Sequence, residues 1–118
     1  MSPKPVPEIS VEEFAKKLRS QDRFIVLDVR ETWELDFARI VDDRLENLPM
    51  SRFAIEGVKA LPDLAKQTEA EIYVLCHQGI RSTDVTGWLV AQGWRKVFSV
   101  AGGIDDYARN VDSSVGLY

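Results

Sequence analysis

The sequence has little of several residue types that define common protein classes. Its 118 residues contain one cysteine, one histidine and no apolar stretch of membrane-spanning length. A single cysteine excludes an internal disulfide, and one cysteine with one histidine cannot complete a metal site. The net charge is −4 without a basic stripe, which argues against nucleic-acid binding. These absences leave a globular protein whose partners are small molecules or other proteins.

The composition predicts one domain in a reducing compartment. With 45% hydrophobic and 29% charged residues, a chain of this length can bury a core without disulfides. The first ten residues lack the apolar stretch of a signal peptide, so we expect a cytoplasmic protein. The proline-spaced residues 1–7 and the tail 112–118 are expected to be loose or extended.

Strands and helices alternate along the chain. Ser10 and Glu13 form a capping box that predicts a helix ending near Ser20. Continuous apolar runs predict buried strands at 23–29, 71–76 and 96–100, with a shorter strand at 44–50. The segment 31–43 is expected to form a short helix followed by a loop. A helix at 51–67 should be kinked or divided near Pro62, and a further helix is expected at 81–92. This alternation predicts an α/β fold with parallel strands and helices on both faces.

The residues that could take part in chemistry lie together in one loop, CHQGIRS, which begins at the end of the strand 71–76. Cys76 ends that strand, where ligands bind in open α/β sheets, and the next helix begins near Arg81. Gly79 can adopt a positive φ, so backbone N–H groups can turn towards the sulfur, and the helix N-terminus adds further donors. Such a cradle favours a thiolate and an anionic substrate, whereas a lone cysteine at a strand end is more often inert core.

The loop CHQGIRS resembles the active-site loop C-x-x-G-x-R-S of the rhodanese superfamily. Three further segments are similar to that family in the same order: EISVEEFAKKL to its opening strand and helix, VLDVRETWE to its D-V-R-x-x-x-E segment, and VFSVAGGIDDYA to its closing segment. The resemblance implies a five-stranded, mainly parallel sheet flanked by helices on both faces. It also implies that Cys76 takes a sulfane sulfur from a donor such as thiosulfate or a persulfide and passes it to a thiophilic acceptor.

The resemblance implies no cofactor, a small sulfur-containing substrate, and a sulfur-carrier or thiol protein as a further partner. The ending DDYARNVDSSVGLY is similar to rhodanese domains fused to sulfur-carrier adenylyltransferases. Two departures stand out: Ala38 and Arg39 occupy positions where glycine and histidine are common, and Tyr107 replaces a tryptophan. The Ala38–Arg39 segment is therefore not expected to supply site residues.

Two other functions are consistent with the same resemblance. Related phosphatases and arsenate reductases have a loop one residue longer, C-x-x-x-x-x-R, whereas Cys76 to Arg81 spans six residues. This spacing disfavours phosphatase chemistry. A non-catalytic rhodanese-like module that binds a partner protein is the main alternative, but such a module has no need of the intact cysteine, glycine and arginine.

The neighbours of Cys76 are the remaining candidate site residues. The planar fork of Arg81 suits a sulfonate, or it forms a salt bridge to Asp28 or Glu34. His77 either tunes the thiol and holds substrate or is simply solvated. Asp28 and Arg30 end a neighbouring strand, where they support the loop or form a structural ion pair. The active-site loop set is His77, Gln78, Gly79, Ile80, Arg81 and Ser82. Gly102 and Gly103 could line the pocket, but a tight turn is enough to explain them. We expect Trp33, Trp88 and Trp94 to be packing residues rather than substrate platforms.

Overall fold

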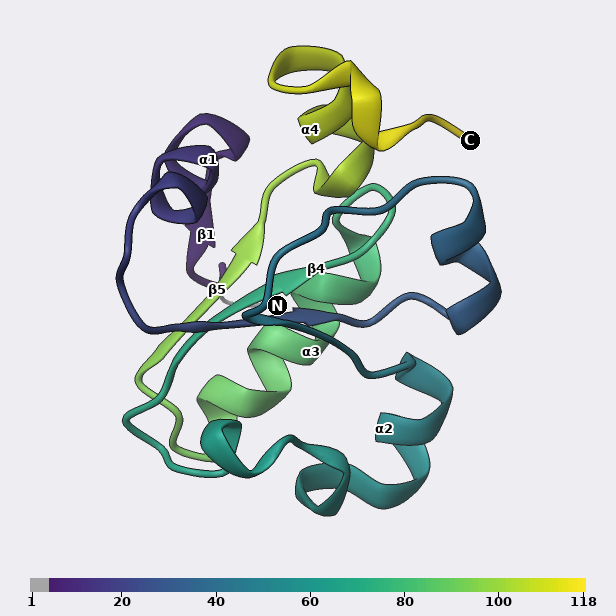
Figure 1. Cartoon of the computed structure of the whole chain (residues 1–118). Helices are drawn as coiled ribbons and strands as arrows, with labels where there is room; N and C mark the ends of the chain where they lie inside the picture. Colours follow the sequence, from purple (N-terminus) through teal and green to yellow (C-terminus); the bar gives the residue numbers. More distant parts are fainter. Residues whose placement is uncertain (1–4) are drawn as a thin grey trace.

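The computed structural model describes residues 5–118 and contains a five-stranded sheet in which every strand pair is parallel (Figure 1). The strand order is β1-β5-β4-β2-β3. The strands are β1 (Glu8–Ile9), β2 (Ile25–Asp28), β3 (Leu45–Asn47), β4 (Glu71–Leu75) and β5 (Lys96–Val100). The α-helices are α1 (Val11–Arg19), α2 (Met50–Glu56), α3 (Ile80–Ala91) and α4 (Gly103–Asn110). The predicted α/β class and the parallel five-stranded sheet are confirmed.

Helices cover both faces of the sheet, α1 and α4 on one and α2 and α3 on the other (Figure 1). Alternate side chains of β4 therefore enter two separate apolar clusters. Tyr73 packs against Phe14 of α1, whereas Val74 belongs to the cluster that contains Leu89 of α3. Burial on both sides is the reason that these strands are continuously apolar in sequence. In the part of the chain that is described, no helix is both long and apolar enough to cross a membrane.

The sheet register brings two loops to one edge. Asp28, the last residue of β2, pairs with Leu75, the last residue of β4. The pairing continues one step further, because Val29 donates its N–H to the carbonyl of Leu75 at 2.9 Å. Val29 and Cys76 consequently leave the sheet side by side, and Arg30 follows one residue later at the same edge, as the parallel arrangement predicts.

The segment 51–67 divides earlier than the sequence predicted. Helix α2 ends at Glu56, and Gly57 has a φ of +60°, which ends the helix before Pro62 is reached. The 3₁₀ helices η2 (Gly57–Ala60) and η3 (Asp63–Ala65) follow on either side of Pro62. The proline therefore separates two short turns rather than the halves of a longer helix.

The tail 112–118 is ordered, and the prediction of a loose end was wrong for it. It contains the 3₁₀ helix η4 (Ser113–Val115), and Arg39 donates its N–H to the carbonyl of Val115 at 2.9 Å. Tyr118 then stacks on Phe37, with ring centroids 5.7 Å apart. At the other end, residues 1–4 lie outside the described residues, whereas the carbonyl of Pro7 accepts a hydrogen bond from Ser99 of β5.

The three tryptophans have different environments, although packing was expected for all of them. Trp94 is buried and its indole N–H donates to the carbonyl of Ala65 at 2.9 Å. Trp88 is 39% exposed and packs edge-on against Phe53. Trp33 is 62% exposed and packs edge-on against Phe37, so it lies at the surface rather than in the core.

Candidate active site

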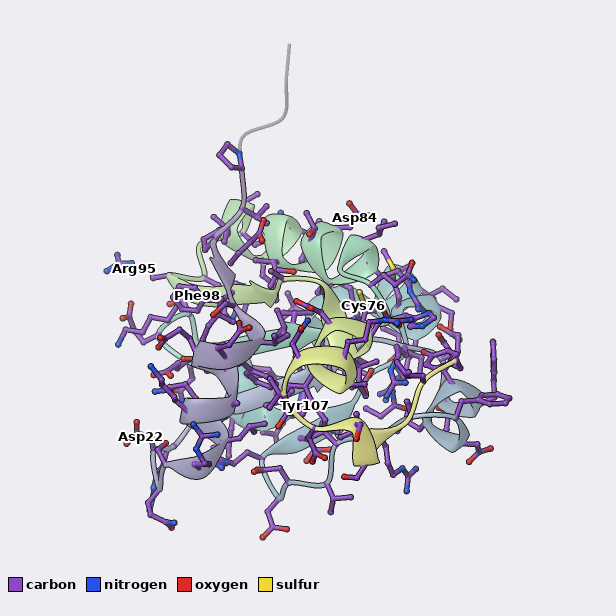
Figure 2. The ribbon with its side chains drawn as sticks, turned by 90° about the horizontal axis from the view of Figure 1, so that it is seen from above. Asp22, Cys76, Asp84, Arg95, Phe98 and Tyr107 are labelled. Atoms are coloured by element: carbon purple, nitrogen blue, oxygen red, sulfur yellow. The ribbon has the colours of Figure 1, made fainter. Side chains whose placement is uncertain are left out.

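The sulfur of Cys76 lies inside a cradle of backbone N–H groups. The N–H groups of Gly79 and Ser82 point at Sγ from 3.1 and 3.3 Å. Gly79 has a φ of +101°, which turns its N–H inward, and Ser82 lies in the first turn of α3, where N–H groups lack helical partners. Cys76 is 1% exposed, and in Figure 2 it lies well inside the molecule while Asp22 and Arg95 point outward. The structure therefore assembles the cradle that the loop sequence predicted.

Two serines support the buried side of this cradle. The hydroxyl of Ser82 lies 3.3 Å from the Cys76 sulfur and 2.8 Å from the hydroxyl of Ser99 on β5. It also lies 3.2 Å from the carbonyl oxygen of Gly79. Sequence reasoning missed Ser99, whose signal is a small polar residue inside the apolar strand KVFSV. The Ser82 hydroxyl thus links the Cys76 sulfur to Ser99 of β5.

The start of α4 holds the loop from the opposite side. Ile104 and Asp105 donate their N–H groups to the carbonyls of Cys76 and His77, at 2.9 and 3.0 Å. The backbones approach so closely that a Cβ on Gly103 would lie 2.4 Å from the His77 carbonyl oxygen. Gly103 also has a φ of +63°. Its role therefore goes beyond the tight turn expected from the sequence, because it allows one helix end to position the active-site loop.

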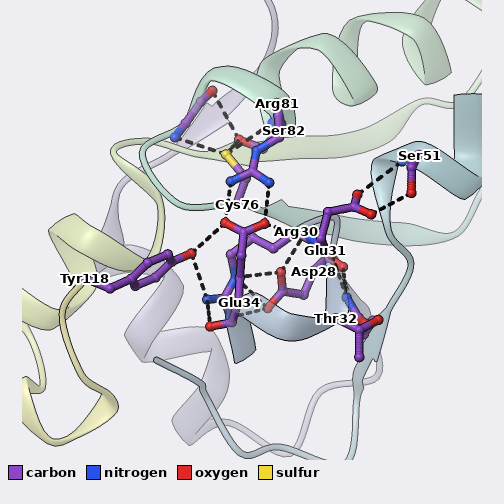
Figure 3. Close-up of polar contacts among 12 residues, drawn as sticks. Asp28, Arg30, Glu31, Thr32, Glu34, Ser51, Cys76, Arg81, Ser82 and Tyr118 are labelled. Atoms are coloured by element: carbon purple, nitrogen blue, oxygen red, sulfur yellow. Dashed lines mark hydrogen bonds and ion pairs between the residues drawn. The ribbon is translucent and has the colours of Figure 1, made fainter. Parts of the chain in front are cut away.

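Arg81 pairs with Glu34, one of the two partners that the sequence left open. Glu34 lies in the 3₁₀ helix η1 (Thr32–Asp36), and its two carboxylate oxygens accept from the two Nη atoms of Arg81 at 2.6 and 2.9 Å (Figure 3). This pairing, together with the N–H of Glu31 and the hydroxyl of Tyr118, lowers the pKa of Glu34 to about 2. The same pairing raises the pKa of Arg81. Both Nη atoms are thus directed at Glu34.

Asp28 and Arg30 form a buried ion pair beside this site. Arg30 is fully buried, and its Nη2 lies 2.7 Å from a carboxylate oxygen of Asp28. Burial works against the charge on Arg30, but the hydrogen bonds that Arg30 donates to Asp28 outweigh it and raise the pKa of the guanidinium. Arg30 therefore adds little uncompensated positive potential, and the structure shows the ion-pair alternative.

His77, Gln78 and Ile80 form the outer part of the loop. The imidazole of His77 stacks on the ring of Tyr118, with centroids 3.8 Å apart and planes 5° from parallel. His77 is half-buried; its Nε2 is buried and has no hydrogen-bond partner among residues 5–118, so the imidazole is packed against Tyr118 rather than fully solvated. Gln78 and Ile80 are exposed. Sequence reasoning missed Tyr118 as a neighbour of the site because it assigned the tail to a loose end.

Comparison with known proteins identifies this arrangement. Residues 10–110 match the Rhodanese-like domain family, which covers most of the chain and the whole Cys76 loop. The chain belongs to the rhodanese-like domain family. A rhodanese-related protein from Thermoplasma volcanium has the same fold, with a TM-score of 0.71 and 27% identity over 89% of this chain and 93% of that one. A structure titled Bacillus anthracis CoADR-RHD matches 96% of this rhodanese-like chain and 18% of its own, with a TM-score of 0.74 and 24% identity.

Curated relatives add a family-level indication of function. The chloroplastic "Rhodanese-like/PpiC domain-containing protein 12" of Arabidopsis thaliana is 34% identical over 97% of this chain. The "Putative sulfur carrier protein YrkF" of Bacillus subtilis is 34% identical over 86% of it. The chain spans only 38% and 51% of the lengths of these two proteins. Rhodanese-like membership and the sulfur-carrier name support a sulfur-related function at the level of the family.

Proposed function

We propose that this rhodanese-like protein is a sulfurtransferase that carries a sulfane sulfur on Cys76. The observation that carries the proposal is the pair of N–H groups, from Gly79 and Ser82, directed at the Cys76 sulfur. Such donors stabilise negative charge on sulfur, both on the attacking thiolate and on a terminal persulfide sulfur. The loop of six residues from Cys76 to Arg81 suits a single sulfur better than a tetrahedral phosphate.

The proposed reaction has two displacement steps. The Cys76 thiolate first attacks the outer sulfur of thiosulfate; a new S–S bond forms, the S–S bond of thiosulfate breaks, and sulfite leaves with the electron pair. A thiophilic acceptor, such as cyanide or a thiolate, then attacks the outer sulfur of the persulfide, and the Cys76 thiolate leaves with the bonding pair. The sulfur atom moves without net oxidation or reduction of the protein, so the cycle needs no redox cofactor.

The geometry assigns supporting tasks to the neighbouring residues. Arg81 clamps the loop through Glu34, so in this proposal the sulfonate of the donor is bound chiefly by backbone N–H groups and the exposed side chains of the rim. The buried Asp28–Arg30 ion pair lies beside the Arg81–Glu34 pair and supports it. We also propose a cytoplasmic setting, with a thiol or sulfur-carrier protein as the physiological acceptor; the name of the Bacillus subtilis relative supports the latter.

Mass spectrometry after incubation with thiosulfate tests the proposal directly. The expected result is one added sulfur on the peptide that contains Cys76, and its removal by cyanide with formation of thiocyanate. Cys76→Ser is the control and should gain no sulfur and show no turnover, because a hydroxyl cannot form a persulfide under these conditions. Absence of added sulfur with thiosulfate and with a small persulfide donor would contradict the proposal.

A partner-binding module remains the second candidate, and one observation favours it. Cys76 is 1% exposed, whereas Ile80 and Trp33 near the site are 74% and 62% exposed. Exposed apolar side chains at a rim suit contact with another protein. The mass-spectrometry experiment distinguishes the two functions, because a pure binding module gains no sulfur on Cys76 from thiosulfate or from the persulfide donor.

A further inference from the structure

Tyr118 joins three separate parts of the candidate site. Its hydroxyl accepts a hydrogen bond from Nη1 of Arg30 at 3.1 Å and donates one to Oε1 of Glu34 at 2.9 Å (Figure 3). Its ring stacks on the imidazole of His77, the residue that directly follows Cys76 in the chain. Phe37 also stacks on this ring. A residue at the end of the chain therefore contacts the strand edge, the η1 helix and the active-site loop at once.

The hydroxyl of Tyr118 links two ion pairs into one network. Arg30 is held by Asp28, and Glu34 holds Arg81 of the loop. The direction of each hydrogen bond is fixed, because Arg30 can only donate and the ionised Glu34 can only accept. Burial raises the pKa of Tyr118, so the hydroxyl keeps the proton that it gives to Glu34. The network thus runs without a break from the sheet edge to the Cys76 loop.

We propose that Tyr118 is a positioning residue for the active-site loop, holding it closed over the Cys76 sulfur through Glu34 and His77. Cys76 is 1% exposed, so a donor can reach its sulfur only when the loop or the side chains packed against it move. Among the described residues the His77 side chain is held by the Tyr118 ring and not by a hydrogen bond from its buried Nε2, which makes the stacking contact the restraint on this side chain. The catalytic consequences rest on the sulfurtransferase function proposed above, whereas the closure of the loop does not.

Three variants separate the contributions of the hydroxyl and the ring. Tyr118→Phe keeps the stacking on His77 and removes the link between Arg30 and Glu34. Tyr118→Ala removes both. Leu117→Ala is the matched control, since Leu117 is the adjacent residue and is 51% exposed. Circular dichroism and thermal unfolding of each variant show that the fold is retained before reactivity is compared.

Alkylation of Cys76 by iodoacetamide at neutral pH tests closure without any need for sulfur transfer. Tyr118→Ala should be labelled about tenfold faster than wild type, because the rate follows the fraction of open loop. Tyr118→Phe and Leu117→Ala should stay within about twofold of wild type, since the ring contact persists in both. A labelling rate for Tyr118→Ala equal to that of Leu117→Ala would overturn the proposal.

Steady-state kinetics with thiosulfate and cyanide test positioning. Tyr118→Phe should raise KM for thiosulfate about threefold with kcat nearly unchanged, because the hydroxyl orients the loop but does not touch reacting atoms. A loss of kcat at constant KM would indicate a smaller folded fraction and would overturn the positioning role. If wild type itself transfers no sulfur, the proposed function fails, and the labelling comparison alone then decides whether Tyr118 closes the loop.

Discussion

The guanidinium of Arg81 and the carboxylate of Glu34 meet in a two-point hydrogen-bonded pair, with N···O distances of 2.6 and 2.9 Å. Glu34 is buried and Arg81 is partly exposed, so the pair closes one side of the candidate site. Because Glu34 receives further hydrogen bonds from the N–H of Glu31 and from Tyr118, its oxygens are fully used. The pair makes Arg81 a support of the loop, so in the proposed reaction the backbone N–H groups are the main anion binders.

Removing the charge of Glu34 should destabilise the fold more than removing an exposed charge. Glu34→Gln leaves Arg81 and Tyr118 without a charged acceptor, and we expect a loss of about 2 kcal/mol in the free energy of unfolding. Glu56→Gln is the control, because its pair with Arg52 is exposed on both sides and should be worth less than about 0.5 kcal/mol. Urea unfolding measures both values. Equal losses in the two variants would contradict a structural role for the Glu34 pair.

The contribution of Glu34 should depend on pH in one direction. The pKa of Glu34 is lowered from 4.5 to about 2, first by the hydrogen bonds from Arg81. A carboxyl group with a depressed folded-state pKa contributes stability that is fully present above its unfolded value and is lost as the pH falls through the folded value. The difference in unfolding free energy between wild type and Glu34→Gln should therefore be constant above about pH 4.5 and shrink towards pH 2. A difference that grows on acidification would contradict this assignment.

The strands and the cradle could be predicted because each depends on residues close in sequence. Apolar runs at β2, β4 and β5 are buried on both faces, and that burial is visible as continuous hydrophobicity. The cradle lies within one short segment, and Gly79 marks the turn that it requires.

The remaining features depend on contacts between distant parts of the chain. Tyr118 reaches Glu34 across 84 positions, and no local pattern distinguishes a tail that folds back from one that is loose. The choice between Asp28 and Glu34 as the partner of Arg81 likewise depends on how η1 packs beside the loop. The end of α2 just before Gly57 was missed because a proline is the more obvious signal in that segment.

Among the glycines of the site, Gly103 should tolerate substitution least. A Cβ there would lie 2.4 Å from the carbonyl oxygen of His77, which is backbone and cannot move without shifting the loop. Gly103→Ala should therefore cost about 3 kcal/mol or more, from strain at positive φ and the steric clash together. Gly93→Ala is the control, since Gly93 also has positive φ but a Cβ there meets nothing within 4 Å, and it should cost about 1 kcal/mol.

Chemical denaturation of the two glycine variants separates the cost of an alanine at positive φ, which both variants carry, from the cost of the steric clash, which only Gly103→Ala carries. Alkylation of Cys76 adds a second readout, because displacement of the loop by Gly103→Ala should change the rate and Gly93→Ala should not. Similar stability losses in both variants would show that the close approach of α4 to the loop has no energetic importance.

Loop length should decide which substrate the cradle accepts. Four residues separate Cys76 from Arg81, and the N–H groups of Gly79 and Ser82 lie at 3.1 and 3.3 Å from the sulfur. A ring this tight fits one sulfur atom and is too small to surround the central atom of a phosphate. Wild type should therefore transfer sulfur and show no hydrolysis of aryl phosphates.

Insertion of one glycine after Gly79 should widen the cradle and weaken the hydrogen bonds to a persulfide. We expect sulfur transfer from thiosulfate to fall by about tenfold or more, because each backbone donor that loses alignment weakens charge stabilisation. Inhibition by vanadate should become stronger, since a tetrahedral oxyanion then fits, although hydrolysis still lacks a general acid for the leaving group. Thiosulfate turnover and vanadate inhibition are measured in parallel on the two proteins. An insertion variant with unchanged turnover and unchanged vanadate affinity, or a wild type that hydrolyses aryl phosphates efficiently, would show that loop length does not select the chemistry.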